Sequence, residues 1–499
     1  MATPNGSGRP TGSRLRRRIP LAVATAVLVL SASVAVGYRV LAPAEVVIPA
    51  RVGLPVVPDP APGVIGTLNA APLIVDGRLR VYATTRTVWA DHPIDARTRR
   101  TPYWSYRRWP AQLAGVVAAG TTVVTRWSDG ELVALDARTG QPRWRAVGPR
   151  PGHGYVGRRT GAATVYAPTG LFTAVAADGT RVLVIAGSTE RRGMDLDSGR
   201  LLWRSDVDRG CRAGDPEAGL TTGSGELVLP ETCAGAALLG FYDVATGRLV
   251  TRWHPTGPGA AGPGSDRPGL AGPAPTGRAT TGPGPVGPRG AGSSPLAPRD
   301  VAPEPAGAPG GAPAAEPGVE KAATGDLRVV PLGCPTGRSG CRAIRTEYAG
   351  VTRGWLLDQG APVAAPTLDW PETVLVDDVA VAPDETGLVA RAVRSGARRW
   401  RWTGGRARVL AVQPGRVHLR TEAAPGGGAG DLVTLETATG AERSRFPFTY
   451  GRDSTTWAPG FAYAASGFVA VERLAEPVDP TDDDRGYYLG DQPVILAAT

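Results

Sequence analysis

The chain has 499 residues, of which 42% are hydrophobic and 20% charged, so it has enough apolar side chains for a large folded core. The formal net charge of +10 comes partly from residues 1–41, which hold six arginines and no acids; the rest has 49 basic against 45 acidic residues. Because no basic stripe is interleaved with aromatics, nucleic-acid binding is not indicated. Lysine occurs once, at Lys321, against 54 arginines, which we interpret as a bias of a GC-rich gene rather than arginine chemistry.

The N-terminus predicts a membrane anchor. Residues 1–18 are basic and precede Ile19–Tyr38, twenty residues without a charge, about the length of a helix that spans a bilayer. We therefore expect a cytoplasmic tail over 1–18, a transmembrane signal-anchor helix over 19–41, and a single-pass protein whose remaining chain is extracytoplasmic. A signal peptide cleaved after Ser33-Val34-Ala35 is the alternative, but the apolar run exceeds the usual 7–15 residues of such peptides.

Five stretches share one pattern: a β-rich run, a turn with glycine, and an aromatic residue four to six positions later. Alternating apolar residues before the turn predict a half-buried strand, and Thr-Gly or Ser-Gly predicts a hairpin whose glycine has positive φ. The aspartates are placed to accept hydrogen bonds from turn N–H groups, and the tryptophans to pack against a neighbouring sheet. The residues of this pattern are Asp136, Gly140, Trp144, Asp195, Gly199, Trp203, Asp243, Gly247, Trp253, Gly396, Trp400 and Gly440, and Val433–Phe446 is a degenerate copy.

The spacing of the turns predicts a series of similar units. Successive turn glycines are 59, 48, 149 and 44 residues apart, and four short strands need about 40–45 residues. A weaker copy at Ile94–Trp104 lies one unit before Gly140, and there is room for further units near 326–358 and after Gly440. We therefore expect an all-β fold of seven or eight units, with a strand from Glu45–Ala83 closing the ring.

Residues 255–325 differ from the rest of the chain, because they are nearly all Gly, Pro, Ala, Ser and Thr. Such a segment cannot bury enough apolar surface to offset the entropy of ordering, so we expect a disordered insert. Its G-x-G-x-x-G run at Gly257–Gly262 is not interpreted as a dinucleotide site, because no helix follows.

Cysteine usage agrees with export from the cytoplasm. The four cysteines form two local pairs, and in an oxidising compartment we expect the disulfides Cys211–Cys233 and Cys334–Cys341. A metal site is not indicated, because no C-x-x-C motif occurs and the four histidines are scattered. The sequence also lacks G-x-S-x-G, H-E-x-x-H, G-x-x-x-x-G-K-[ST] and C-x-x-C-H motifs, so we name no catalytic residue.

The repeated pattern, D-x-x-[ST]-G-x-x-x-W after a V-x-A-L strand, resembles the repeat of the PQQ-like β-propellers, the quinoprotein alcohol dehydrogenase-like superfamily. Asp136–Trp144 and Asp195–Trp203 match closely, and the other copies are degenerate. The resemblance implies a seven- or eight-bladed β-propeller of four-stranded blades, formed by residues 42–254 and 326–499. The shared residues describe how a blade reverses and packs rather than a cofactor site.

Three functions remain open. The resemblance to the non-enzymatic branch implies a membrane-anchored scaffold that binds a protein or a cell-envelope polymer, without cofactor or metal. The enzymatic alternative is a PQQ-dependent dehydrogenase with Ca²⁺; the family's enzymes commonly carry an adjacent-cysteine disulfide, and this chain has no Cys-Cys pair. The third is a sensor of a small extracellular ligand, for which the 18-residue tail is too short to hold a kinase or DNA-binding module.

Overall fold

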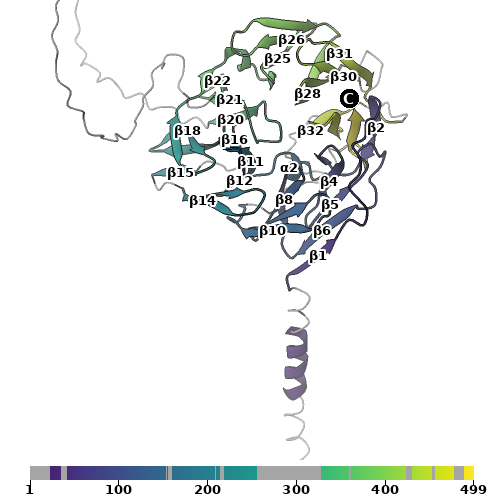
Figure 1. Ribbon diagram of the computed structural model, residues 1–499, viewed down its shortest axis with the longest axis vertical. Coiled ribbons are helices and arrows are strands. Elements are labelled where there is room, and N and C mark those ends of the chain that lie inside the picture. Colours follow the sequence, from purple (N-terminus) through teal and green to yellow (C-terminus); the bar gives the residue numbers. More distant parts are fainter. Residues whose placement is uncertain are drawn as a thin grey trace, which may run out of the picture. The chain divides into compact units, whose positions relative to one another are not determined.

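The protein is seen in a computed structural model in which eight antiparallel sheets surround a common centre (Figure 1). The described residues are 23–34, 37 and 42–499, apart from 153, 156–159, 208–209, 214–218, 256–326, 359–360, 423–429, 452–455 and 477–487. Within them the fold is an all-β propeller with eight blades, the larger of the two numbers that the sequence predicts.

The first four blades follow one another along the chain. Blade 1 comprises β3 (Leu73–Val75), β4 (Leu79–Ala83), β5 (Thr87–Asp91) and β6 (Trp104–Trp109). Blade 2 comprises β7 (Leu113–Ala119), β8 (Thr122–Trp127), β9 (Glu131–Asp136) and β10 (Pro142–Val147). Blade 3 comprises β11 (Leu171–Val175), β12 (Arg181–Ala186), β13 (Glu190–Asp195) and β14 (Leu201–Asp206). Blade 4 comprises β16 (Leu220–Thr221), β17 (Glu226–Cys233), β18 (Ala236–Asp243) and β19 (Leu249–Trp253), and β15 (Cys211–Ala213) pairs with β17.

The remaining strands form blades 5 to 8. Blade 5 comprises β20 (Arg328–Leu332), β21 (Ala343–Tyr348), β22 (Val351–Leu356) and β23 (Val363–Ala364), followed by the 3₁₀ helix η2 (Pro366–Leu368). Blade 6 comprises β24 (Val374–Val376), β25 (Val379–Asp384), β26 (Gly387–Ala392) and β27 (Arg398–Trp402). Blade 7 comprises β28 (Ala407–Gln413), β29 (Arg416–Thr421), β30 (Asp431–Glu436) and β31 (Glu442–Pro447). Blade 8 contains β32 (Ala458–Ala465), β33 (Phe468–Leu474) and β34 (Val494–Ala498).

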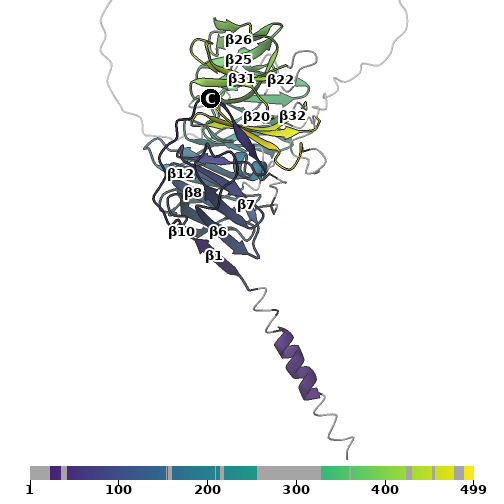
Figure 2. The same ribbon diagram turned by 90° about the vertical axis from the view of Figure 1, so that its right-hand side faces the viewer.

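The ring is closed by a strand from the N-terminal part of the chain. β2 (Gly63–Leu68) pairs antiparallel with β34 and becomes the outer strand of blade 8. The preceding strand, β1 (Ala44–Ile48), pairs with β6 and adds a fifth strand to blade 1, at the edge of the ring (Figure 2). The expected closing strand from Glu45–Ala83 is therefore confirmed, and closure leaves no unpaired gap between the first and last blades.

Apolar side chains fill the space between neighbouring blades. Seven clusters of buried residues account for all eight interfaces, because the largest cluster joins blades 8, 1 and 2. Each blade is thus apolar on both faces, which explains the nearly continuous buried runs in β8 and β33. The hydrophobic core therefore lies between neighbouring blades and not within any single blade.

Two predicted segments fall largely outside the described residues. A helix covers residues 23–34, and within the described part of the chain no helix is long and apolar enough to cross a membrane. The rest of the expected anchor over 19–41, apart from residue 37, is not described, so the anchor stays a prediction. The expected insert, 255–325, lies between β19 and β20, and its residues from 256 on are also outside the described chain.

Buried His418 in β29 makes the fold sensitive to acid. Its ring contacts Gln413 and Thr434 at 2.9 and 3.1 Å, and burial, with a smaller effect of the Arg416 charge, lowers its pKa to about 3. Because the unfolded chain takes up a proton near pH 6.5 and the fold does not, this contribution to stability is complete above about pH 6.5 and is lost as pH falls toward 3.

We expect His418→Gln to reduce this acid sensitivity. Between pH 7 and 5 the wild-type protein should lose about 2 kcal/mol more unfolding free energy than the variant, as follows from the two pKa values. Guanidinium unfolding at both pH values measures the difference. Equal losses for the two proteins would contradict a neutral, buried His418.

Candidate functional site

The aspartates of the repeated pattern hold the turns that follow them. Asp136 accepts a hydrogen bond from the Arg138 N–H at 2.8 Å, Asp195 from the Ser198 N–H at 2.8 Å, and Asp243 from the Thr246 N–H at 2.8 Å. The turn glycines all adopt left-handed φ values between +68° and +74°, which favour glycine; they are Gly140, Gly199, Gly247, Gly396 and Gly440. These residues therefore shape the hairpin between the third and fourth strands of their blades.

Four tryptophans dock on the turn of the next blade. In each case the indole Nε1 donates to a turn carbonyl: Trp104 to Ala137 at 2.7 Å, Trp144 to Leu196 at 3.0 Å, Trp203 to Val244 at 2.6 Å and Trp400 to Thr437 at 2.7 Å. The rings lie directly on the glycines, because a Cβ added there would lie 2.4–2.6 Å from the nearest indole side-chain atom; the glycines are Gly140, Gly199, Gly247 and Gly440. Each glycine is thus required both by its φ and by the indole.

Two copies of the pattern differ from this arrangement. The weak copy ending at Trp104 has arginine in place of the turn glycine, yet Trp104 docks as the others do. By contrast, Trp253 meets Trp355 of blade 5 edge-on, with ring centroids 4.7 Å apart. The connection between β22 and β23, the third and fourth strands of blade 5, has no Thr-Gly or Ser-Gly pair on which Trp253 could dock, which explains the difference.

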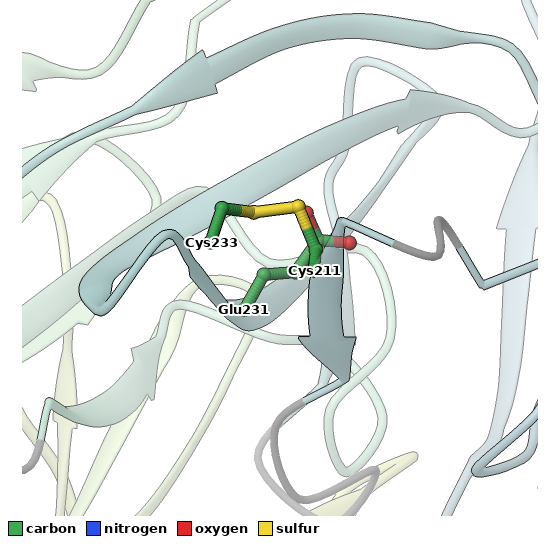
Figure 3. Close-up of side chains that lie close together, drawn as sticks. All are labelled: Cys211, Glu231 and Cys233. Carbon is green, nitrogen blue, oxygen red and sulfur yellow. A yellow bond between two sulfur atoms is a disulfide. The ribbon is translucent and has the colours of Figure 1, made fainter.

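Both expected disulfides are present. Cys211–Cys233 joins β15 to β17, and Cys334–Cys341 closes the loop between β20 and β21. Figure 3 shows Glu231 beside the first disulfide; among the described residues this trio is the one group of three possible metal ligands. Its two sulfurs are bonded to each other, and the buried Glu231 carboxylate accepts from Arg191 at 2.7 Å. The group therefore stabilises the fold and is no metal site.

Replacing Cys211 and Cys233 together by serine should lower the unfolding free energy by about 3 kcal/mol. The crosslink spans 22 residues, and removing it restores the loop entropy of the unfolded chain. The Cys334→Ser/Cys341→Ser variant should lose less, about 2 kcal/mol, because its loop spans only seven residues. Denaturant unfolding of the oxidised proteins measures both, and a larger loss for the shorter loop would contradict the entropic explanation.

Two connecting segments meet at the centre of the ring (Figure 1). One contains the short helix α2 (Ala162–Tyr166), whose Tyr166 ring stacks on Tyr463 of blade 8 at 4.8 Å and whose hydroxyl donates to the Pro72 carbonyl at 3.1 Å. The other is the disulfide loop of blade 5, where a Cβ on Gly337 would lie 2.4 Å from the Tyr166 carbonyl oxygen. Tyr166 thus contacts the neighbouring blades 8 and 1 as well as the loop of blade 5.

Two hollows lie at opposite ends of the strands in blades 4 to 8. The smaller, about 550 Å³, is lined by turns of blades 4 to 7, at 223–224, 333–335, 375–378, 393–394 and 412–414. The larger, about 1180 Å³, lies at the other ends of the strands, and we call it the groove. The groove is lined by residues 371–372, 374, 383–385, 406–410, 420–422 and 459.

The groove has walls of opposite charge. Glu372, Asp384 and Glu385 line it from blade 6, and Arg406, Arg408 and Arg420 line it from blade 7. Asp384 pairs with Arg401 at 2.7 Å, whereas Arg420 donates to the Trp457 carbonyl at 2.6 Å and lies 4.0 Å from the centre of the Trp457 ring. Burial, with a smaller effect of the Arg408 charge, lowers the pKa of Arg420 to about 10. The arginine remains charged at neutral pH.

Sequence reasoning missed the buried arginines. Arg126 donates to the carbonyls of Pro149, Thr169 and Gly170 at 3.0–3.2 Å, and Arg345 to the Trp370 carbonyl at 2.8 Å. Both lie on the second strand of a blade and bind the connection toward the next blade. The interpretation of arginine content as base-composition bias is therefore incomplete. An arginine within an apolar strand, as in Val-Val-Thr-Arg-Trp at 123–127, is the signal that could have identified them.

Comparison with known proteins gives one family match. A family model described as outer membrane protein assembly factor BamB matches residues 63–190. No curated protein matches the chain. Solved structures with some similarity include BamB from Moraxella catarrhalis, at 13% identity and a TM-score of 0.37, covering 87% of this chain and 96% of that one.

Two further structures are similarly distant. The computationally designed Ika8 protein is 10% identical with a TM-score of 0.37, covering 88% of this chain and 100% of that one. The dihydro-heme d1 dehydrogenase NirN in complex with DHE is 12% identical with a TM-score of 0.34, covering 78% of this chain and 63% of that one. At these values the structures carry no argument about function.

Eight blades, joined in several places by a tryptophan on a turn glycine, define the class of protein as an eight-bladed β-propeller. The family match over residues 63–190 covers blades 1 and 2 and reaches the third strand of blade 3. Over residues 63–190 the chain is similar to this family of PQQ-like β-propellers.

Proposed function

We propose that this propeller is a non-catalytic module that binds a protein partner outside the cytoplasm, anchored in the membrane by its N-terminal segment. The match of residues 63–190 to the model of an assembly factor carries the proposal. The repeated residues support it, because their aspartates bind turn N–H groups and four of their tryptophans contact the next blade. They build a scaffold that presents two hollowed faces rather than a reaction centre.

The described residues at the centre do not fit Ca²⁺ and PQQ. Ca²⁺ takes six to eight oxygen ligands, several of them from carboxylates. Among the residues described there, no three carboxylate, histidine or cysteine ligands converge, and the buried Glu472 carboxylate already accepts from the Phe461 N–H at 3.1 Å. We therefore derive no reaction step through this cofactor.

The membrane and compartment are proposed from the sequence and the disulfides. The basic tail followed by twenty uncharged residues favours an anchor with a cytoplasmic N-terminus. Two disulfides with no free cysteine among the four favour an oxidising compartment. Protease treatment of intact spheroplasts should degrade the propeller, and a mature chain that begins at Val36 would contradict the anchor.

Crosslinking in intact cells tests the binding function. The full-length chain, purified from membranes after crosslinking, should carry one reproducible protein partner, identified by its peptides. The enzymatic alternative is tested on the same purified chain, by adding PQQ and Ca²⁺ and following dye reduction with alcohols and sugars. Dye reduction at rates above the apo protein would overturn the non-catalytic proposal.

A sensor of a small ligand is the second candidate function, and the smaller hollow is the observation that favours it. Its volume of about 550 Å³ lies in the range of small-molecule sites, and its lining includes the apolar side chains of Leu356, Leu375 and Val393. A ligand bound there should raise the melting temperature of the full chain, and Val393→Arg should abolish the rise. Screening extracellular metabolites by thermal shift measures this.

A further inference from the structure

The basic wall of the groove contains a pairing that does not serve stability. Arg408 of β28 and Arg420 of β29 lie directly opposite each other in the ladder. Like charges in this position destabilise a sheet. Arg406, two residues before Arg408, adjoins the same pair, because its carbonyl accepts from the Glu422 N–H at 2.9 Å. Within the described chain, neither Arg406 nor Arg408 has a carboxylate within ion-pair distance.

The opposite wall has the complementary charge. Glu372 and Glu385 line the groove from blade 6, and no described cation lies within ion-pair distance of either carboxylate. Trp370, which directly precedes the lining residue Pro371, is 72% exposed. Exposed tryptophan and arginine are the residue types that most often carry the binding energy of protein interfaces. The groove thus presents both charges and an aromatic side chain.

We propose that the groove binds an extended peptide segment of a partner protein, which places an acidic side chain near Arg406 and Arg408 and a basic one near Glu372 and Glu385. This rests on the proposed function and names the chemistry of its partner. The groove's volume of about 1180 Å³ exceeds that of ordinary small-molecule sites, so it accommodates more than one side chain. Trp370 packs on the apolar part of the segment at the rim.

The charges favour a peptide over a polyanion. The lining has three arginines, and against them four acids: Glu372, Asp384, Glu385 and Glu422. A phosphate polymer or nucleic acid would therefore meet an acidic wall and gain no net attraction. A peptide supplies both charges within a few residues, and complementary charge on both sides also sets its direction in the groove.

Photocrosslinking in living cells tests this. The full-length chain carries p-benzoylphenylalanine at position 370, and the crosslinked peptides are sequenced by mass spectrometry. We expect peptides of one other protein that contain an acidic and a basic residue close together. Arg406→Glu/Arg408→Glu should lower the crosslink yield at least tenfold, equivalent to about 1.4 kcal/mol.

Matched variants separate charge from folding. Arg107→Glu/Arg248→Glu makes the same charge change at two exposed arginines of blades 1 and 4 and should leave the yield unchanged. Glu372→Lys/Glu385→Lys reverses the other wall and should also lower the yield about tenfold. Melting curves of all variants identify any that fail to fold. The two charge reversals, one on each wall, test the groove independently of each other.

The remaining outcomes overturn one proposal or both. A second probe position is Val363 of blade 5, which is 47% exposed. If p-benzoylphenylalanine crosslinks a protein at position 363 but not at position 370, the groove is not the binding site, although the proposed binding function still holds. Crosslinks from 370 to polysaccharide or nucleic acid, or a yield unchanged by both charge reversals, would overturn the peptide assignment. The absence of protein crosslinks from both positions would overturn the binding function as well.

Discussion

Trp104→Ala should lower the unfolding free energy of the propeller by about 3–5 kcal/mol, the range for removing a buried aromatic side chain. Trp104 is fully buried, its ring lies on Gly140 of the next blade, and its Nε1 donates to the Ala137 carbonyl at 2.7 Å. Alanine would leave both a cavity and an unpaired buried carbonyl. Guanidinium unfolding followed by circular dichroism measures the loss.

Two further variants separate packing from the hydrogen bond. Trp104→Phe keeps an aromatic ring but leaves the Ala137 carbonyl without its donor, so it should lose about 1–3 kcal/mol. Trp370→Ala removes a tryptophan that is 72% exposed and should leave stability unchanged. If Trp104→Ala lost no more unfolding free energy than Trp370→Ala, then docking of the tryptophan on the glycine turn would not stabilise the contact between blades.

Arg80→Met should lower the unfolding free energy by about 3–5 kcal/mol, the range for breaking a buried ion pair. Both side chains of the Arg80–Asp91 pair are fully buried, with two N–O distances of 2.8 Å. Arg80 also donates to the carbonyls of Ala96 at 2.8 Å and Thr98 at 3.1 Å. Methionine would leave the buried Asp91 carboxylate without its counter-charge, although the Arg100 N–H still donates to it at 2.7 Å. Denaturant unfolding at pH 7 measures the effect.

Replacing both members tests whether the lone charge causes the loss. Arg80→Met/Asp91→Leu should be more stable than Arg80→Met, because no uncompensated charge remains in the core. The exposed pair Arg394–Asp358, at 2.8 Å, is the control, and Arg394→Met should lose less than about 1 kcal/mol. Equal losses for the single and double core variants would show that the carbonyl contacts of Arg80 matter more than its charge.

Much of the fold could be predicted from local signals. The blade turns repeat a residue, glycine, whose left-handed φ depends only on the residues beside it. The blade predicted near 326–358 is present as β20 to β22, and the strands predicted after Gly440 as β33 and β34. Blade number could be stated only as seven or eight, because blade 5 lacks the pattern and long connections obscure the spacing.

The candidate site could not be predicted in the same way. The groove joins residues of blades 6, 7 and 8, and its central feature, Arg408 opposite Arg420, depends on the register between β28 and β29. A shift of one residue in that register would place different side chains opposite each other. Nor does the composition reveal that Arg126 is buried against backbone carbonyls while Arg406 lines a groove.

The sequence by itself determined that this is a propeller of hairpins with glycine turns and tryptophans, because turn geometry and strand alternation are local properties. It also paired the cysteines by proximity along the chain. Only the tertiary structure decided that β2 closes the ring, that the tryptophans bind the next blade, and that opposite charges face each other across the groove. These contacts join residues far apart in the chain, so they exist only once the blades have packed.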